Sequence, residues 1–106
     1  MAWLLLLAAG ALEIVWAASL KQSEGFTRLQ PSLVTVVAMA GSFVLLAMAM
    51  RTLPLGVAYT VWTGIGAIGA FAVGVFVLGE GASPMRLAAA GLIVTGLLLM
   101  KLSSEG

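Results

Sequence analysis

A single carboxylate interrupts the apolar N-terminal part of the chain. Glu13 is the only charged residue in the run MAWLLLLAAGALEIVWAASL, which covers residues 1–20. An ionised carboxylate at the centre of a bilayer costs about 3 kcal/mol on insertion scales, so acidic residues in such runs are usually functional. Glu13 is therefore the first candidate for chemistry.

Aromatic and hydroxyl residues could share a site with this carboxylate. Trp16 follows Glu13 by three residues, which places both on one helix face, and Tyr59 and Trp62 repeat this spacing. Ser42 is the polar residue in the middle of another apolar run. A guanidinium group could form two parallel hydrogen bonds with a carboxylate and stack on Trp or Tyr. A quaternary ammonium ion could use only the aromatic faces, so the residues leave both cations open.

These residues also have structural interpretations. The aromatic residues could anchor helices at membrane interfaces, although they lie deeper in their runs than Trp3 does. Ser42 could bond a backbone carbonyl or a neighbouring helix. Glu13 could pair with Lys21 or Lys101, but both lysines lie near the ends of their runs, where they can reach water.

The composition predicts an integral membrane protein. Of the 106 residues, 62% are hydrophobic and 8% charged, and the mean hydropathy is +1.18. A membrane helix needs about 20 apolar residues. The chain divides into four such runs, at about residues 2–20, 32–50, 55–78 and 84–102. We therefore predict one all-α transmembrane domain that covers residues 1–106.

Several classes of site and partner are not expected. The chain has no Cys and no His, which excludes disulfides, thiolate chemistry and imidazole ligands, so we predict no metal site and no cofactor. No nucleophile–base pair that would indicate an enzyme is evident. A net charge of +1 gives no reason to expect a nucleic-acid partner.

No basic residue precedes Lys21, so the first run is predicted to be a membrane helix rather than a cleaved signal peptide.

The connections contain helix-start signals. Pro31 is predicted to open the second helix, and Ser83 to cap the fourth helix with Pro84 at its first position. The connections are short, so we expect successive helices to be antiparallel neighbours.

The basic residues are nearly balanced across the membrane. Arg51 and Lys101 would share the side of the N-terminus, whereas Lys21, Arg28 and Arg86 would lie on the other side. With the terminal amine the two sides are almost equal. We therefore hypothesise that the chain inserts in both orientations and that two copies form an antiparallel dimer.

Small residues mark two of the runs. The third contains WTGIGAIG, and its Gly66, Ala70 and Gly74 recur every four residues, while the fourth has a stripe of small residues. The candidate hinge glycines are Gly64, Gly66 and Gly69, and the candidate dimer contacts are Gly91, Thr95 and the neighbouring Gly96. Clustered glycines could form a hinge or simply provide packing grooves, and the stripe could equally serve packing within one chain.

The chain resembles the small multidrug resistance transporters over essentially its whole length. The resemblance rests on Glu13 in the first of four short runs, SEGFTRLQPS after it, and AYTVWTGIGA in the third. Within that family, LEIVWA looks like the guanidinium-exporter subtype, because exporters of quaternary ammonium drugs usually have a small residue at the position of Trp16. Lys101 at the end of the fourth run also fits this subtype.

The resemblance implies an antiparallel homodimer of dual-topology subunits in the bacterial plasma membrane that exchanges guanidinium for protons by alternating access. It implies that Glu13 of each subunit is shared between protons and substrate. The matching binding-site positions are Trp16, Ser42, Tyr59 and Trp62. The stretch GIGAIG matches the flexible part of the third helix, and the region from Gly91 to Gly96 matches the main dimer contact.

Two other functions remain open. A broad-specificity exporter of quaternary ammonium compounds in the same family would transport such ions at the expense of guanidinium. A small membrane protein that modulates a partner would explain four packed helices. It would not explain a carboxylate, two indoles and a phenol at helical spacings.

Overall fold

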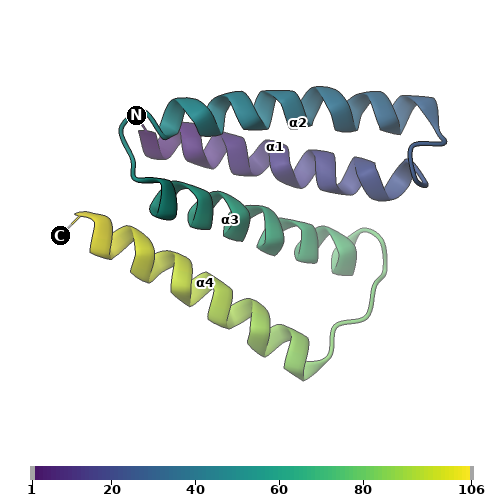
Figure 1. The fold of residues 1–106 in the computed structure, drawn as a ribbon. Coiled ribbons are helices and arrows are strands. Elements are labelled where there is room, and N and C mark those ends of the chain that lie inside the picture. The colour runs from purple at the N-terminus through teal and green to yellow at the C-terminus, as the bar shows by residue number, and fades with distance from the viewer. Residues whose placement is uncertain (1, 106) are drawn as a thin grey trace.

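The computed structural model describes residues 2–105, and side chains up to residue 103, as four α-helices joined by short connections (Figure 1). The helices are α1 (Ala2–Gln22), α2 (Leu29–Ala49), α3 (Leu55–Phe76) and α4 (Pro84–Glu105). All four are long and apolar enough to cross a membrane. The predicted all-α architecture with four membrane spans is therefore confirmed.

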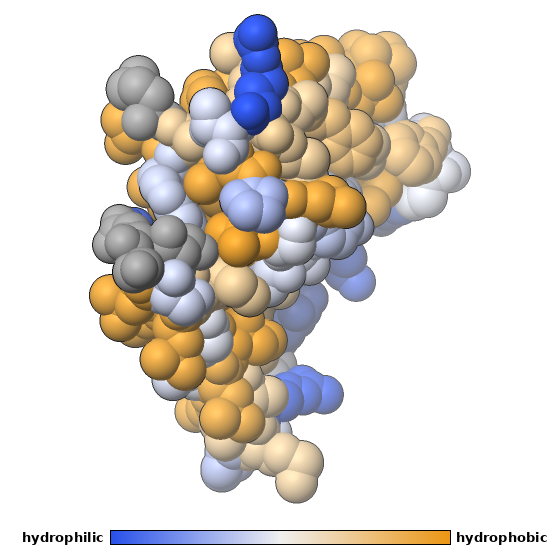
Figure 2. Space-filling view, turned by 60° about the vertical axis from the view of Figure 1, so that its left-hand side comes forward, coloured by the Kyte–Doolittle hydropathy of each residue, from blue (hydrophilic) through white to orange (hydrophobic). Residues whose placement is uncertain are grey.

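The helices lie in one layer in the order α2, α1, α3, α4 (Figure 1). The molecule measures 45 × 35 × 16 Å, and its smallest dimension is little more than the diameter of one helix, about 10–12 Å. α1 and α3 run in one direction and α2 and α4 in the other, so the two ends of the chain lie on the same side. Hydrophobic side chains cover most of the face drawn in Figure 2.

One predicted neighbour relationship is wrong. α1 packs on α2 and α3 packs on α4, as expected, but α3 contacts α1 extensively and α2 only slightly. Ile65 of α3 lies against Gly10 of α1, and Ile14 of α1 lies against Gly69 of α3, so tightly that a Cβ on either glycine would collide. Glycines let two helix backbones approach closely in a membrane. These contacts explain why α1, rather than α2, is the main partner of α3.

The buried core lies among α1, α2 and α3. Its residues are Leu6, Ala9, Leu46, Ala49, Ala58, Val61 and Trp62. The described residues of α4 include no buried side chain, and α4 packs on α3, with one further contact from Lys101 to the Trp3 ring of α1. The first three helices therefore form the packed part of the subunit, with α4 attached to one edge.

α2 begins earlier than predicted. It starts at Leu29 rather than at about residue 32, so Pro31 lies inside the first turn and not at the first helical position. Proline is tolerated there because the N–H groups of the first turn have no partner within the helix.

The connection to α4 follows the predicted capping. α3 ends at Phe76, two residues before the predicted boundary, and α4 starts at Pro84 and extends to Glu105. The Arg86 N–H donates to Ser83 Oγ at 3.1 Å. This bond is the one expected of an N-cap, so the predicted role of Ser83 is confirmed.

Candidate functional site

Glu13 projects from the middle of α1 onto the backbone of α3. Its carboxyl group lies against Gly66, and a Cβ on that glycine would collide with the carboxyl atoms. The Oε1 atom is buried and has no hydrogen-bond partner among the described residues. Buried polar atoms in native proteins are nearly always hydrogen-bonded. This oxygen is therefore chemically suited to receive a proton or a hydrogen-bond donor.

The lysines proposed as structural partners lie at opposite ends of α1. Lys21 is eight residues from Glu13, about 12 Å along a helix. The Lys101 ammonium lies 4.8 Å from the ring centroid of Trp3, near the start of α1. The arrangement therefore does not support pairing of either lysine with Glu13.

Trp16 lies about one turn beyond Glu13 on the same helix. Its Nε1 atom is also buried without a hydrogen-bond partner among the described residues. Because an indole N–H only donates, this group requires an acceptor. One buried acceptor and one buried donor thus lie one turn apart, each without a partner within the described part of the subunit.

Ser42 and Trp62 form a buried link between three helices. Ser42 Oγ donates to the Ala9 carbonyl at 2.7 Å and accepts from Trp62 Nε1 at 2.9 Å. The structural interpretation of Ser42, a bond to a backbone carbonyl, is therefore observed. A hydroxyl oxygen has two acceptor positions, so Ser42 can still accept one more hydrogen bond. Trp62 has used its only N–H and can offer only its ring to a ligand.

The predicted aromatic residues belong to one row of rings. The centroid distances are 6.5 Å from Trp16 to Phe43, 5.8 Å from Phe43 to Trp62 and 5.4 Å from Trp62 to Tyr59. The first two contacts are edge-on, and the third is tilted by 50°. The row runs across α1, α2 and α3, and it ends at Tyr59, which is 53% exposed.

Phe43 joins the two indoles in this row and is not among the site residues predicted from the sequence. Phe43 is the only aromatic residue of α2 and directly follows Ser42, which is the signal that could have identified it. Residues at i and i+1 lie on different sides of a helix, so spacing did not associate Phe43 with the site. Its role depends on packing between α2 and both neighbouring aromatic residues.

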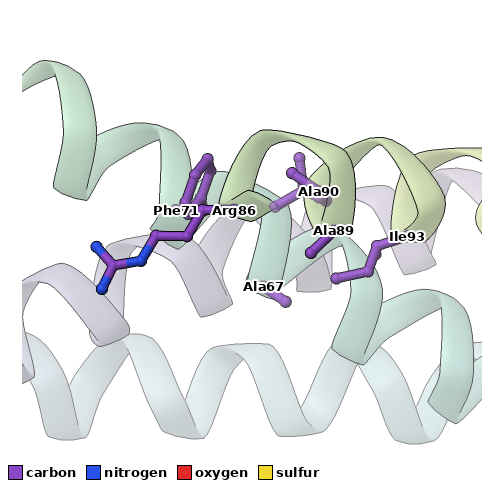
Figure 3. A pocket seen from close by; sticks show the side chains of 7 residues that line it. Ala67, Phe71, Arg86, Ala89, Ala90 and Ile93 are labelled. Atoms are coloured by element: carbon purple, nitrogen blue, oxygen red, sulfur yellow. The ribbon is translucent and has the colours of Figure 1, made fainter. Parts of the chain in front are cut away.

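Two cavities lie on the other side of α3, next to α4. The larger, of about 530 Å³, is lined by Tyr59, Thr60, Thr63, Gly64, Ala67, Ile93, Gly96, Leu97 and Met100. The smaller, of about 280 Å³, has Arg86 and Phe71 beside small and aliphatic side chains (Figure 3). Arg86 Nη1 donates to the Gly81 carbonyl at 3.0 Å. Tyr59 thus faces the larger cavity, whereas Glu13 approaches α3 from the α1 side.

Comparison with known proteins places the chain in a family. The family model described as Small Multidrug Resistance protein matches residues 1–93. The chain belongs to the small multidrug resistance family. Proteins named guanidinium exporter from Citrobacter freundii and Salmonella typhimurium are each 58% identical to it over 105 residues. The guanidinium exporter of Escherichia coli K12 is 57% identical over 105 residues, and each alignment covers 99% of this chain and 100% of the relative.

The family membership agrees with the architecture. A small multidrug resistance protein with four apolar helices is a multi-pass membrane protein of bacteria. The names of the family and of the relatives indicate a transporter rather than an enzyme.

The three candidate hinge glycines of this small multidrug resistance protein each receive a side chain from another helix. Gly66 receives Glu13 and Gly69 receives Ile14, both from α1, while Gly64 receives Leu97 from α4. α3 is continuous through all three positions. A role in packing is therefore observed, and a role as a hinge stays a prediction.

Of the candidate dimer contacts on α4, Gly91 and Thr95 line neither cavity next to α3, whereas Gly96 lines the larger one. Gly91, Thr95 and Gly96 are exposed, and no described atom lies within 4 Å of a Cβ built on either glycine. Thr95 Oγ1 donates to the Gly91 carbonyl at 2.8 Å, so its hydroxyl donor is used within α4. Neither glycine therefore receives a side chain from another helix within the described part of the chain.

Proposed function

We propose that this small multidrug resistance protein is a proton-coupled antiporter that exports guanidinium and small substituted guanidinium cations. The observation that carries the proposal is the buried Glu13 Oε1, which has no hydrogen-bond partner among the described residues and lies one turn from Trp16. The similarity to relatives named guanidinium exporter supports the substrate class.

The chemistry of guanidinium matches these groups. Its planar N–H fork can form two parallel hydrogen bonds with the Glu13 carboxylate, and its faces can stack on the rings of Trp16 or Trp62. The remaining acceptor position of Ser42 suits a third N–H. Guanidinium offers no acceptor, so the Trp16 N–H would donate to a carboxylate oxygen of the site.

Proton coupling follows from competition for one carboxylate. When Glu13 binds the cation it must be ionised, and when it carries a proton it offers no charge to the cation. Binding of either species excludes the other. Proton entry on one side is thereby linked to cation exit on the other.

Alternating access would require a second copy. The open face of α4 around Gly91 and Thr95 and the nearly balanced loop charges support an antiparallel homodimer of dual-topology subunits. Such a pair is an inverted repeat made from two chains. If the two copies adopt different conformations, exchanging these conformations turns the site from one side of the membrane to the other.

Glu13→Gln tests this function because it keeps the shape of the side chain and removes its charge. We expect guanidinium transport driven by a proton gradient in proteoliposomes to fall to background. Glu24→Gln is the matched control, since Glu24 is an exposed connection residue and should transport like wild type. Wild-type transport in Glu13→Gln would contradict the proposal.

Export of quaternary ammonium ions is the competing function within the family. We expect solid-supported-membrane electrophysiology of the purified wild type to give currents with guanidinium and phenylguanidinium and at most weak currents with tetramethylammonium, which has no N–H to donate. Stronger currents with tetramethylammonium than with guanidinium would favour the broad-specificity exporter.

A further inference from the structure

A second carboxylate lies on the same glycine stripe of α3. Gly66, Ala70 and Gly74 recur at four-residue spacing, and the Glu13 carboxyl lies on the first of them. Glu80, from the connection between α3 and α4, lies on Gly74 in the same way, because a Cβ there would collide with its carboxylate. The Glu80 N–H donates to the Gly74 carbonyl at 2.8 Å, which holds the Glu80 backbone close to the glycine.

The two carboxylates are connected by matching stripes on α1 and α3. Glu13, Ala17 and Lys21 recur at four-residue spacing on α1, as Gly66 and Gly74 with Ala70 between them do on α3. Two helical turns, about 12 Å, separate the ends of each stripe. The helix contact therefore continues from the buried carboxylate towards the end of the membrane span.

A cavity of about 200 Å³ lies at that end. Its lining is Ala17, Ala18, Lys21, Ala70, Gly74, Leu78 and Glu80. Small side chains predominate, and the cavity begins about one turn beyond Glu13. Its lining residues belong to the end of α1, the end of α3 and the connection that follows α3. These segments lie on one side of the molecule (Figure 1).

Two opposite charges line this cavity. Among the described residues, no ion pair joins the Glu80 carboxylate to the Lys21 ammonium or to another cationic side chain, so neither charge is neutralised by direct contact. A charged group near a binding site attracts ions of opposite sign and repels ions of like sign, which changes their rate of association. Glu80 would attract a cation to the cavity, and Lys21 would oppose it.

We propose that Glu80 forms an outer cation site in the cavity at the end of the contact between α1 and α3, which a guanidinium-type cation occupies before it reaches Glu13. Lys21 limits the strength of this outer site, so that the cation moves on. The inference rests on the proposed function of Glu13. In an antiparallel dimer, one such outer site would lie at each membrane face.

The rate of guanidinium association at low ionic strength tests the outer site. For Glu80→Gln we expect an association rate about threefold to tenfold lower than that of wild type, with less than about a twofold change in the dissociation constant, because the remote charge acts mainly on approach. Lys21→Gln should change the rate in the opposite direction. Both differences should shrink at about 1 M salt, where screening acts over about 3 Å.

Two further variants distinguish a specific site, in which the Glu80 carboxylate lies on Gly74, from a general effect of surface charge. Gly74→Ala keeps every charge but displaces the Glu80 carboxylate, and it should slow association as Glu80→Gln does. Glu24→Gln removes one exposed carboxylate outside the cavity and should leave the rate unchanged. An unchanged rate in Glu80→Gln, an equal loss in Glu24→Gln, or a wild-type rate in Gly74→Ala would each overturn the outer site.

The two proposals fail in different ways. If wild type shows no guanidinium transport, or if Glu13→Gln transports normally, the proposed function fails. If wild type transports guanidinium and needs Glu13, but the variants at Glu80 and Gly74 bind it at the wild-type rate, only the outer site fails.

Discussion

The two sides of α3 differ sharply in how they are packed. Towards α1, glycines on both helices receive side chains so closely that a Cβ at Gly10, Gly66 or Gly69 would collide. Towards α4 there is one contact of this kind, Leu97 on Gly64, but cavities of about 530 Å³ and 280 Å³ lie along the rest of the contact, and the described residues of α4 include none that is buried. The α1 side is therefore closely packed within the described chain, whereas the α4 side leaves open space.

This difference suggests that the α1–α3 contact and the α3–α4 contact have different roles. Close helix packing in a membrane depends on small residues, because lipid and apolar side chains are equally hydrophobic. On the α1 side that packing holds the Glu13 carboxyl in place. On the α4 side Gly91 and Thr95 are exposed, which suits contact with a second copy, whereas Gly96 lines the larger cavity next to α3.

Gly66→Ala should have the largest effect, because it adds a methyl group where the Glu13 carboxyl lies. We expect guanidinium transport in proteoliposomes to fall at least about tenfold, since misplacing a binding group by about 1 Å can reduce rates a hundredfold. Gly56→Ala is the matched control, because nothing lies within 4 Å of a Cβ at that position. If both variants transport like wild type, the close contact on the α1 side does not position Glu13.

Gly91→Leu tests the α4 side of the comparison. A Cβ at Gly91 meets nothing within 4 Å among the described residues, so we expect the chain to fold normally. We expect the fraction of dimers, measured by single-molecule photobleaching in bilayers, to fall several-fold, and transport to fall with it. Gly56→Leu, at another open glycine, should leave the dimer fraction unchanged. Full dimerisation of Gly91→Leu would show that the open face of α4 is not the contact.

Ser42→Ala should have a smaller effect, confined to the packed side. It leaves the buried Trp62 N–H without an acceptor, which costs about 1–3 kcal/mol. We expect that loss of stability in unfolding by denaturing detergent, together with a shifted Trp fluorescence spectrum. Ser103→Ala, which removes only an exposed bond within α4, should change neither. Unchanged stability in Ser42→Ala would mean that the link between the three helices contributes little.

Much of the fold could be predicted because it depends on local patterns. Run length and hydropathy indicate four membrane spans, and Ser83 before Pro84 indicates the start of α4. The partner of α3 could not be predicted, since a stripe of small residues permits close approach without specifying which helix approaches. The short connection between α2 and α3 predicted that they pack together, but they contact each other only slightly and α1 is the main partner of α3.

The candidate site could be predicted from the sequence to about the same extent as the fold. The isolated charge at Glu13 and the spacing to Trp16 are properties of a single helix, and they are visible in the sequence. Phe43 joins the site through packing between helices, and the N–H of Trp62 is used by Ser42. Such contacts depend on how the helices are arranged, which spacing along the chain does not determine.

The most direct test of the central claim is to measure protons released when guanidinium binds. Purified protein in a weakly buffered solution would be titrated with guanidinium while the pH is recorded. We predict that wild type releases protons as guanidinium binds and that Glu13→Gln releases none. Guanidinium binding to wild type without proton release, or equal release from Glu13→Gln, would contradict the claim that the Glu13 carboxylate binds either a proton or the cation.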